Sequence, residues 1–321
     1  MPHRHMTPFI SKAPANLMLM GEHAVVYGHP AIACAIDQWI SIAWQPTTPN
    51  QLIIDSKLGH HQTDFQTLAD HPKLRFILEA FQAFQPQLQR LPFGLHLTVQ
   101  SDFSSTIGFG SSAAVLAATL GGLNHLLQLN RTTEQLFQIG LNIIHAIQKR
   151  GSGTDLAASL TGGLLHFQPA TAQQPAQLIP LPFQPFGLSL VYCGYKTPTA
   201  EVLSQVQQQW QIQPQLLEQL YQLMGDTTHT AIQALQQQDL TSFFKLINTY
   251  QGLMDALGVN DATLSQWVYQ LRTLGCPASK ISGSGLGDCV LGLYLDPIEF
   301  TCSAPYQTFQ PQITSKGMHI L

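Results

Sequence analysis

The residues best suited to chemistry in this sequence form a glycine and serine run, Gly108-Phe109-Gly110-Ser111-Ser112, followed by an apolar stretch that reaches Leu127. Glycines let a backbone approach a phosphate closely, and the first N–H groups of a helix favour an anion. The serine hydroxyls can add a hydrogen-bond donor or an oxygen ligand for Mg²⁺. Serine is also a favoured helix N-cap, so a plain cap explains this run equally well by itself. The run lacks the Gly-Lys-Ser/Thr ending of a P-loop.

Two further glycine-containing runs lie near the ends of the chain. Within the run Lys12 to Gly28, Asn16 to Met20 reads as a short apolar strand that leads into Gly21-Glu22-His23, where polar side chains can meet a ligand. Lys280 to Val290 places three glycines between two expected strands, which predicts a turn open to a backbone or a ligand. Taken alone, a polar turn and a tight hairpin explain these runs better than a binding site does.

An acidic residue, Asp155, begins an apolar helix after the run Arg150-Gly151-Ser152-Gly153-Thr154. Ser152 and Asp155 have the spacing of a capping box, in which the acid satisfies backbone donors. The functional alternative is a carboxylate that orients or deprotonates a substrate hydroxyl for attack on a γ-phosphate. By itself the capping interpretation is the stronger of the two.

Composition excludes several classes of protein. The formal net charge is −4, with no basic patch for nucleic acid. Five scattered cysteines lack zinc-ligand spacing, and their odd number without an apolar leader is typical of a reducing cytoplasm. The longest apolar helical stretch, residues 113–123, is too short to span a bilayer. We therefore expect a cytoplasmic protein with no nucleic-acid or membrane partner.

The elements that would position these residues alternate irregularly between strand and helix, which favours an α+β fold over a doubly wound sheet. Apolar periodicity predicts helices over 111–127 and 132–149, and at least three more between 197 and 274. Thr197-Pro198 reads as a helix N-cap followed by proline at the first helical position. The Pro- and Gln-rich segment 169–185 is the expected boundary, giving domains 1–175 and 176–321.

Together, the order and spacing of these runs resemble the GHMP kinases, the group that includes galactokinase, homoserine kinase, mevalonate kinase and phosphomevalonate kinase. The resemblance extends from about Ser11 to Gly292. Gly-Glu-His-Ala-Val-Val-Tyr-Gly, from Gly21 to Gly28, is most similar to mevalonate kinases, whereas galactokinases normally continue Gly-Glu-His into Thr-Asp-Tyr. The resemblance implies an N-terminal domain similar to ribosomal protein S5 domain 2 and a ferredoxin-like C-terminal domain.

The resemblance also implies roles for individual residues and an activity. The residues implied to bind ATP are Gly108, Gly110, Ser111, Ser112, Gly283, Ser284 and Gly285, with Ser112 also binding Mg²⁺. Asp155 would be the catalytic carboxylate, and Glu22, His23 and Thr199 would contact the substrate. The implied activity is that of a phosphotransferase acting on the primary hydroxyl of mevalonate, in isoprenoid precursor synthesis. Whether the chain forms a homodimer stays open.

Two charged groups of the mevalonate kinase pattern are missing here. Asn16 replaces the lysine of Ala-Pro-Gly-Lys, and Lys12 would be about 13 Å away along a strand. The stretch 143–148 offers no carboxylate as the expected acidic metal ligand, and Ser104 to Thr106 replaces the usual Pro-x-Gly lead-in. We therefore expect a modest turnover or a substitute cation such as Lys149 or Arg150.

These departures keep three alternatives open. Ala-Pro-Ala-Asn resembles the opening of diphosphomevalonate decarboxylase, although the Lys-Tyr-x-Gly-Lys run of that enzyme is absent. The spacing of His145 before Gly151 resembles phosphomevalonate kinase, and Lys149, Arg150 and Lys196 offer cations for a phosphorylated substrate. A catalytically weak sensor that binds ATP or a metabolite is the third alternative.

Overall fold

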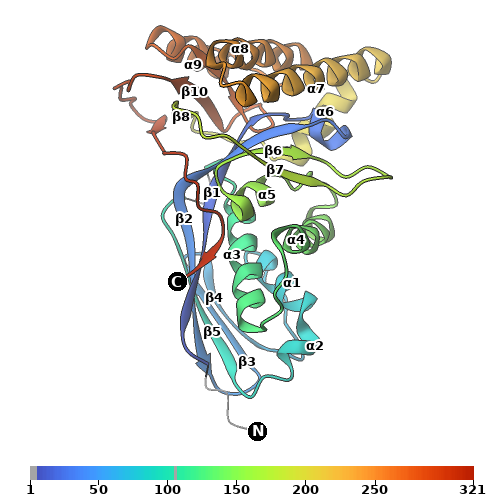
Figure 1. Ribbon diagram of the computed structural model, residues 1–321, viewed down its shortest axis with the longest axis vertical. Helices are drawn as coiled ribbons and strands as arrows, with labels where there is room; N and C mark the ends of the chain where they lie inside the picture. The colour runs from blue at the N-terminus through green and yellow to red at the C-terminus, as the bar shows by residue number, and fades with distance from the viewer. Residues whose placement is uncertain (1–5, 105–106) are drawn as a thin grey trace.

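The structure is a computed structural model that describes residues 6–104 and 107–321. Ser105 and Thr106, which belong to the expected lead-in to the glycine–serine run, lie outside the described residues. The chain builds two sheets, each covered by its own group of helices (Figure 1). This arrangement confirms the expected two-part α+β fold.

The larger sheet holds most of the N-terminal half. Its strands are β1 (Phe9–Met20), β2 (Ala31–Thr47), β3 (Gln51–Ser56), β4 (Gly59–Asp64), β5 (Gly94–Ser101), β6 (Leu164–Gln168), β7 (Gln177–Leu181) and β12 (His319–Ile320). They run in the order β12-β1-β2-β5-β3-β4, with β6 paired to β2 and β7 to β6. Only β3 and β5 are parallel; the other pairs are antiparallel.

Strand β2 changes partner along one of its edges. Residues Ala31–Cys34 pair with β6 and Ile40–Thr47 pair with β5, while β1 occupies the opposite edge. The gap between the two partners is where the chain leaves β5 toward the glycine–serine run and where it enters β6. The sheet topology therefore brings these two connections to one place.

The helices of the N-terminal half lie on one face of the larger sheet (Figure 1). They are α1 (Arg75–Ala83), α2 (Gln85–Leu88), α3 (Ser111–Leu126), α4 (Thr133–Gln148) and α5 (Thr154–Thr161). Helix α3 is apolar nearly all round and is buried between the sheet and its neighbouring helices. Gly122 lets α3 lie against the Trp44 ring, because a Cβ there would come within 2.1 Å of that ring.

The smaller sheet belongs to the C-terminal half. Its strands are β8 (Gly187–Tyr192), β9 (Ala278–Ser282), β10 (Cys289–Tyr294) and β11 (Gln307–Phe309), in the antiparallel order β11-β8-β10-β9. Helices α6 (Thr199–Gln209), α7 (Pro214–Gln236), α8 (Leu240–Leu257) and α9 (Ala262–Thr273) accompany it, with α8 and α9 packed on its strands. Leu17 and Leu19 of β1 belong to the same core as this half, so β1 joins the two parts.

Two details differ from the sequence-based expectations. Sheet membership changes after Leu181, because β7 pairs with β6 beyond the expected boundary at 175/176, and β12 returns to the larger sheet. Helix α6 starts at Thr199 with Pro198 as its N-cap, so Thr197 is not the cap. The Thr197 hydroxyl instead donates to the Leu286 carbonyl at 2.6 Å. Within the described residues, no helix is long and apolar enough to cross a membrane.

Candidate active site

A cavity of about 590 Å³ is lined by residues from both halves of the chain. Its walls come from the end of β1, the starts of α3 and α5, the loop before α6 and the turn between β9 and β10. The cavity lining includes these sequence-predicted site residues: Glu22, His23, Gly108, Gly110, Ser111, Ser112, Asp155, Thr199, Gly283 and Ser284. Gly285 is absent from the lining and is buried instead, where a Cβ would come within 2.3 Å of the Val259 carbonyl oxygen.

The glycine–serine run does not form a serine cap. Helix α3 starts at Ser111 with Gly110 as its N-cap in the left-handed region (φ 64°), and no side-chain hydrogen bond caps this helix in the described structure. A Cβ on Gly110 would come within 2.2 Å of the Asn16 amide, so both the conformation and the space require glycine. The helix N-terminus and the Ser112 hydroxyl are therefore free to face an anion in the cavity.

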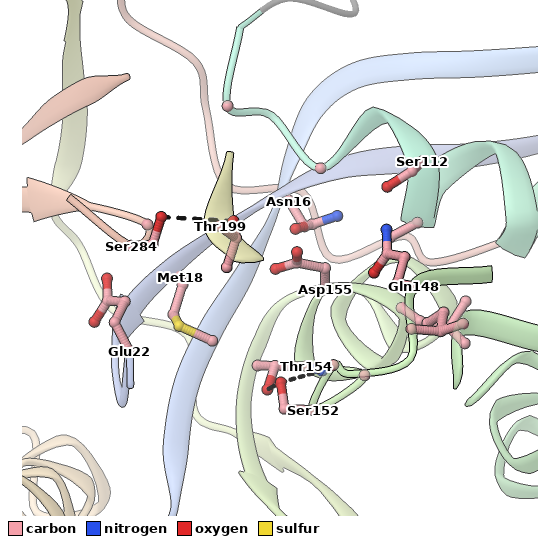
Figure 2. Close-up of a pocket in the computed structure, with 18 of the residues that line it drawn as sticks. Asn16, Met18, Glu22, Ser112, Gln148, Ser152, Thr154, Asp155, Thr199 and Ser284 are labelled. Atoms are coloured by element: carbon pink, nitrogen blue, oxygen red, sulfur yellow. Dashed lines mark hydrogen bonds between the residues drawn. The ribbon is translucent and has the colours of Figure 1, made fainter. Parts of the chain in front are cut away.

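The carboxylate of Asp155 lies at the centre of the cavity (Figure 2). The capping-box prediction is wrong, because α5 starts at Thr154 with Gly153 as its N-cap and no side-chain cap. Ser152 bonds instead to the hydroxyl of Thr154, at 2.8 Å. The Asp155 side chain is open to the cavity yet enclosed by protein, and this loss of solvent raises its pKa to about 6, although Lys196 opposes the shift.

The labelled side chains divide around Asp155 (Figure 2). Ser112 and Gln148 lie on one side, near the start of α3, and Glu22, Thr199 and Ser284 lie on the other. The Asn16 amide lies above the Asp155 carboxylate. A carboxylate placed between an anion site and a second polar wall can take a proton from a group attacking that anion.

The polar wall begins at a strained corner. His23 has φ 61° and ψ −59°, and the Ala24 N–H donates to the Glu22 carbonyl at 2.7 Å, which together form a γ-turn of the rare, strained type. The His23 Nε2 donates to the Ser284 carbonyl at 2.8 Å, and burial lowers the pKa of this imidazole. His23 is therefore neutral at pH 7, and its buried Nδ1 is an acceptor without a partner among the described residues.

Glu22 is held by residues far away in the sequence. Its Oε1 accepts a hydrogen bond from Lys280 of β9, and Tyr250 of α8 donates its hydroxyl to the Glu22 carbonyl at 2.7 Å. Burial raises the pKa of Glu22 and lowers that of Lys280, and the attraction within the pair opposes both shifts. Glu22 Oε2 is buried without a hydrogen-bond partner among the described residues.

The glycine turn between β9 and β10 reaches both sides of the cavity. Gly283 and Ser284 line the cavity, and the Ser284 hydroxyl lies 3.5 Å from that of Thr199. At the other end of the turn, Asp288 Oδ1 accepts from the Gly108 N–H at 2.9 Å. Asp288 therefore connects this turn to the glycine–serine run.

Sequence reasoning missed some residues of the cavity wall. Asp288 was part of a noted run without a role, and Gln148 was considered only as a missing acid. Lys196 was considered only as one of three cations for a phosphorylated substrate; it lines the cavity and pairs with Asp288 Oδ2 at 2.7 Å. Of the two cations expected as substitutes, Arg150 lines the cavity and Lys149 is outside its lining. Lys12 stacks over the Trp39 ring, which agrees with its expected exclusion from the site.

Comparisons with known proteins agree with this geometry. The family described as GHMP kinases N terminal domain matches residues 75–163, and the one described as GHMP kinases C terminal matches residues 231–300. The mevalonate kinase of Pyrococcus horikoshii is 30% identical over 304 residues, covering 88% of each chain. Two solved structures share the fold. A Lin0012 protein from Listeria innocua has a TM-score of 0.85 at 18% identity, covering 98% of this chain and 99% of that one. L. major mevalonate kinase in complex with R-mevalonate has a TM-score of 0.74 at 24% identity, with coverages of 92% and 89%.

Both halves of the chain thus match the same family, and the curated relative covers both halves together. The cavity lies where the two matched regions meet, with the start of α3 on one side and the glycine turn on the other. The chain belongs to the GHMP kinases and is a phosphotransferase that acts on an alcohol group.

Proposed function

We propose that this chain transfers the γ-phosphate of Mg·ATP to the primary hydroxyl of mevalonate. The observation that carries the proposal is the position of Asp155 between the start of α3 and the corner at Glu22 and His23. The mevalonate kinase of Pyrococcus horikoshii supports mevalonate as the acceptor, because its match to this chain covers 88% of both sequences.

In this mechanism the start of α3 binds the phosphates and Asp155 accepts the hydroxyl proton. The N–H groups of the first α3 turn and the Ser112 hydroxyl face the negative charge. A pKa of about 6 leaves Asp155 mostly ionised at pH 7 and still basic enough to act as a general base. Glu22, His23 and Thr199 line the side of the cavity where the substrate would bind. Positioning and electrostatics supply most of the acceleration in such transfers.

The donor set fits a magnesium ion that arrives with the nucleotide. The described residues contain no group of three or more His, Cys, Asp or Glu side chains that could hold a metal by themselves. Ser112 and Gln148 present neutral oxygens on the phosphate side, and Mg²⁺ takes its other ligands from phosphate oxygens and water. Such an ion would neutralise charge on the phosphates, and Gln148 occupies the stretch in which an acidic ligand was expected.

A second candidate, phosphomevalonate kinase, is favoured by one observation. Arg150 and Lys196 both line the cavity, and two cations suit a substrate that carries a phosphate. The cavity carries acidic groups as well, at Glu22, Asp155 and Asp288, which limits the room for added negative charge.

The test is an assay of ADP release with mevalonate, phosphomevalonate, diphosphomevalonate, galactose and homoserine in parallel. We expect turnover with mevalonate, and a loss of about 100-fold or more in kcat for Asp155→Asn. Asp296→Asn, at an exposed position outside the cavity lining, is the matched control. Turnover of phosphomevalonate alone, phosphate release with diphosphomevalonate, or nucleotide binding without any turnover would each overturn the proposal.

A further inference from the structure

Asn16 occupies the position that carries a lysine in the mevalonate kinase pattern, and its side chain makes a structural hydrogen bond. Asn16 is 1% exposed, and its amide donates to the Ser159 hydroxyl at 2.9 Å. Ser159 in turn donates to the Pro14 carbonyl at 2.8 Å. Asn16 therefore ties β1 to α5 beneath the phosphate site and brings no charge to it. A cation for the reaction has to come from elsewhere on the cavity wall.

Lys196 is held next to the phosphate site by contacts on both sides of it in the chain. The Tyr195 carbonyl accepts from the Asp288 N–H at 2.7 Å, and the Thr197 hydroxyl donates to the Leu286 carbonyl. These bonds fix the backbone of Lys196 against the glycine turn. Its side chain stays 41% exposed to the cavity, so the ammonium group can change partner without any backbone movement.

The partner of Lys196 in the structure is itself part of the phosphate site. Asp288 uses Oδ2 for the Lys196 ammonium group, at 2.7 Å, and Oδ1 for the Gly108 N–H, at 2.9 Å. One carboxylate thus holds both a cation and a phosphate-loop donor, which are two groups that an incoming phosphate attracts. Asp288 therefore holds Lys196 next to the proposed phosphate site.

The charge of Lys196 also reaches the proposed base. Lys196 is the cation that opposes the rise of the Asp155 pKa caused by burial, whereas Glu22 adds to that rise. The charged or titratable groups that share the cavity wall with Asp155 are Glu22, His23, Arg150, Lys196 and Asp288. Arg150 lines the same cavity but is absent from the causes of this shift.

We propose that Lys196 is a further catalytic residue, which contacts the transferring phosphoryl group and the attacking hydroxyl in place of the lysine missing at position 16. This role rests on the phosphotransfer proposed above. The hydroxyl oxygen forms a bond to the γ-phosphorus, the bond from that phosphorus to the β–γ bridging oxygen breaks, and ADP leaves with the bonding electrons. The hydroxyl proton passes to Asp155. Lys196 stays protonated throughout and offsets the charge that develops on the oxygens.

The experiment compares Lys196→Met, Lys196→Arg and the control Lys149→Met, whose exposed side chain is outside the cavity lining. We expect Lys196→Met to lower kcat about 100-fold, the size typical of one lost charge-stabilising contact, with little change in the KM for ATP. The acid limb of kcat/KM should move to higher pH, because Asp155 loses the cation that lowers its pKa. Lys196→Arg should keep kcat within about tenfold, and Lys149→Met should match the parent.

Two results would overturn the role of Lys196. One is a Lys196→Met enzyme with kcat within about threefold of the parent and an unmoved acid limb. The other is the same loss and the same pH shift in Arg150→Met with Lys196→Met near normal, which assigns the cation to Arg150. If the parent enzyme does not phosphorylate mevalonate but phosphorylates another alcohol of the panel, the proposal of mevalonate as substrate is wrong. The role of Lys196 is then tested with that alcohol. A parent inactive on every acceptor overturns both proposals.

Discussion

Replacing Lys280 by methionine should destabilise the whole chain, because it breaks an ion pair that has no access to water. The side chain of Lys280 is 0% exposed and that of Glu22 is 2% exposed, and the two residues are 258 positions apart. Methionine keeps most of the volume and leaves Glu22 buried without its cation. Removing one partner of a buried pair costs about 3–5 kcal/mol. That is a large part of the roughly 5–15 kcal/mol by which a domain is usually stable.

A cycle of variants separates the ion pair from the loss of a side chain. We expect Lys280→Met and Glu22→Gln each to lower the free energy of unfolding by about 3–5 kcal/mol. The double variant should be more stable than the sum of these losses predicts, by about 2 kcal/mol or more, since no unpaired charge is left. Lys57→Met, at an exposed lysine of the β3–β4 turn, is the control.

Urea unfolding followed by tryptophan fluorescence measures these differences. Trp44 lies in the larger sheet and Trp267 in α9, so both halves of the chain carry a buried reporter. A cost of 3–5 kcal/mol also corresponds to a fall in melting temperature of roughly 6–20 °C at about 2–4 °C per kcal/mol. Single variants that cost less than about 1 kcal/mol, or a double variant whose loss equals the sum, would refute the reasoning.

Three further predictions concern the cavity. The kcat/KM for the acceptor should rise with pH through about 6, because Asp155 acts only when ionised and its pKa is raised to about 6. A profile that is flat from pH 5 to 8 would contradict its role as base. Ser112→Ala should raise the Mg²⁺ concentration for half-maximal rate by roughly tenfold without a change in melting temperature, and an unchanged magnesium dependence would remove Ser112 from the metal site. Asn16→Lys should lower the free energy of unfolding by about 1–3 kcal/mol, because the buried bond to Ser159 is lost. It should not raise kcat if Lys196 already supplies the charge, and a clear gain in rate would show that the cation is missing.

Local patterns in the sequence were enough to predict the elements that carry the site. The apolar run after Gly110 forms α3, and the stretch 132–149 forms α4 with a capping box at Thr132. The strands expected near Lys280 and Val290 are β9 and β10. Each of these predictions rests on the hydrophobic pattern of neighbouring residues, which can be read without knowing the contacts with distant segments.

The capping predictions failed because side chains with hydroxyl or carboxyl groups have several uses. Ser152 and Asp155 have capping-box spacing, yet Gly153 provides the left-handed N-cap and frees Asp155 for the cavity. Thr197 precedes a proline, yet its hydroxyl bonds to the glycine turn. In both cases a tertiary contact, which sequence spacing does not encode, decides where the polar group points.

Sequence reasoning placed distant segments at one site but did not predict the individual contacts between them. The Gly108 N–H bonds to Asp288, 180 residues later, and Glu22 pairs with Lys280 from the other end of the chain. Such pairs follow from the topology that joins the two sheets, and hydrophobic periodicity does not predict them. The pairing of Lys196 with Asp288, 92 positions apart in the sequence, is of the same kind.

The corner at His23 shows how the two halves depend on each other. A backbone in the region of its γ-turn costs about 1–3 kcal/mol and persists only where the surroundings fix it. Here the surroundings are Tyr250, Lys280 and the Ser284 carbonyl, all supplied by the C-terminal half. The segment after β1 that carries Glu22 and His23 is therefore held in this shape by contacts with the C-terminal half. Because the same turn holds Gly108 through Asp288, the C-terminal half would position the proposed phosphate side and the proposed acceptor side of the cavity together.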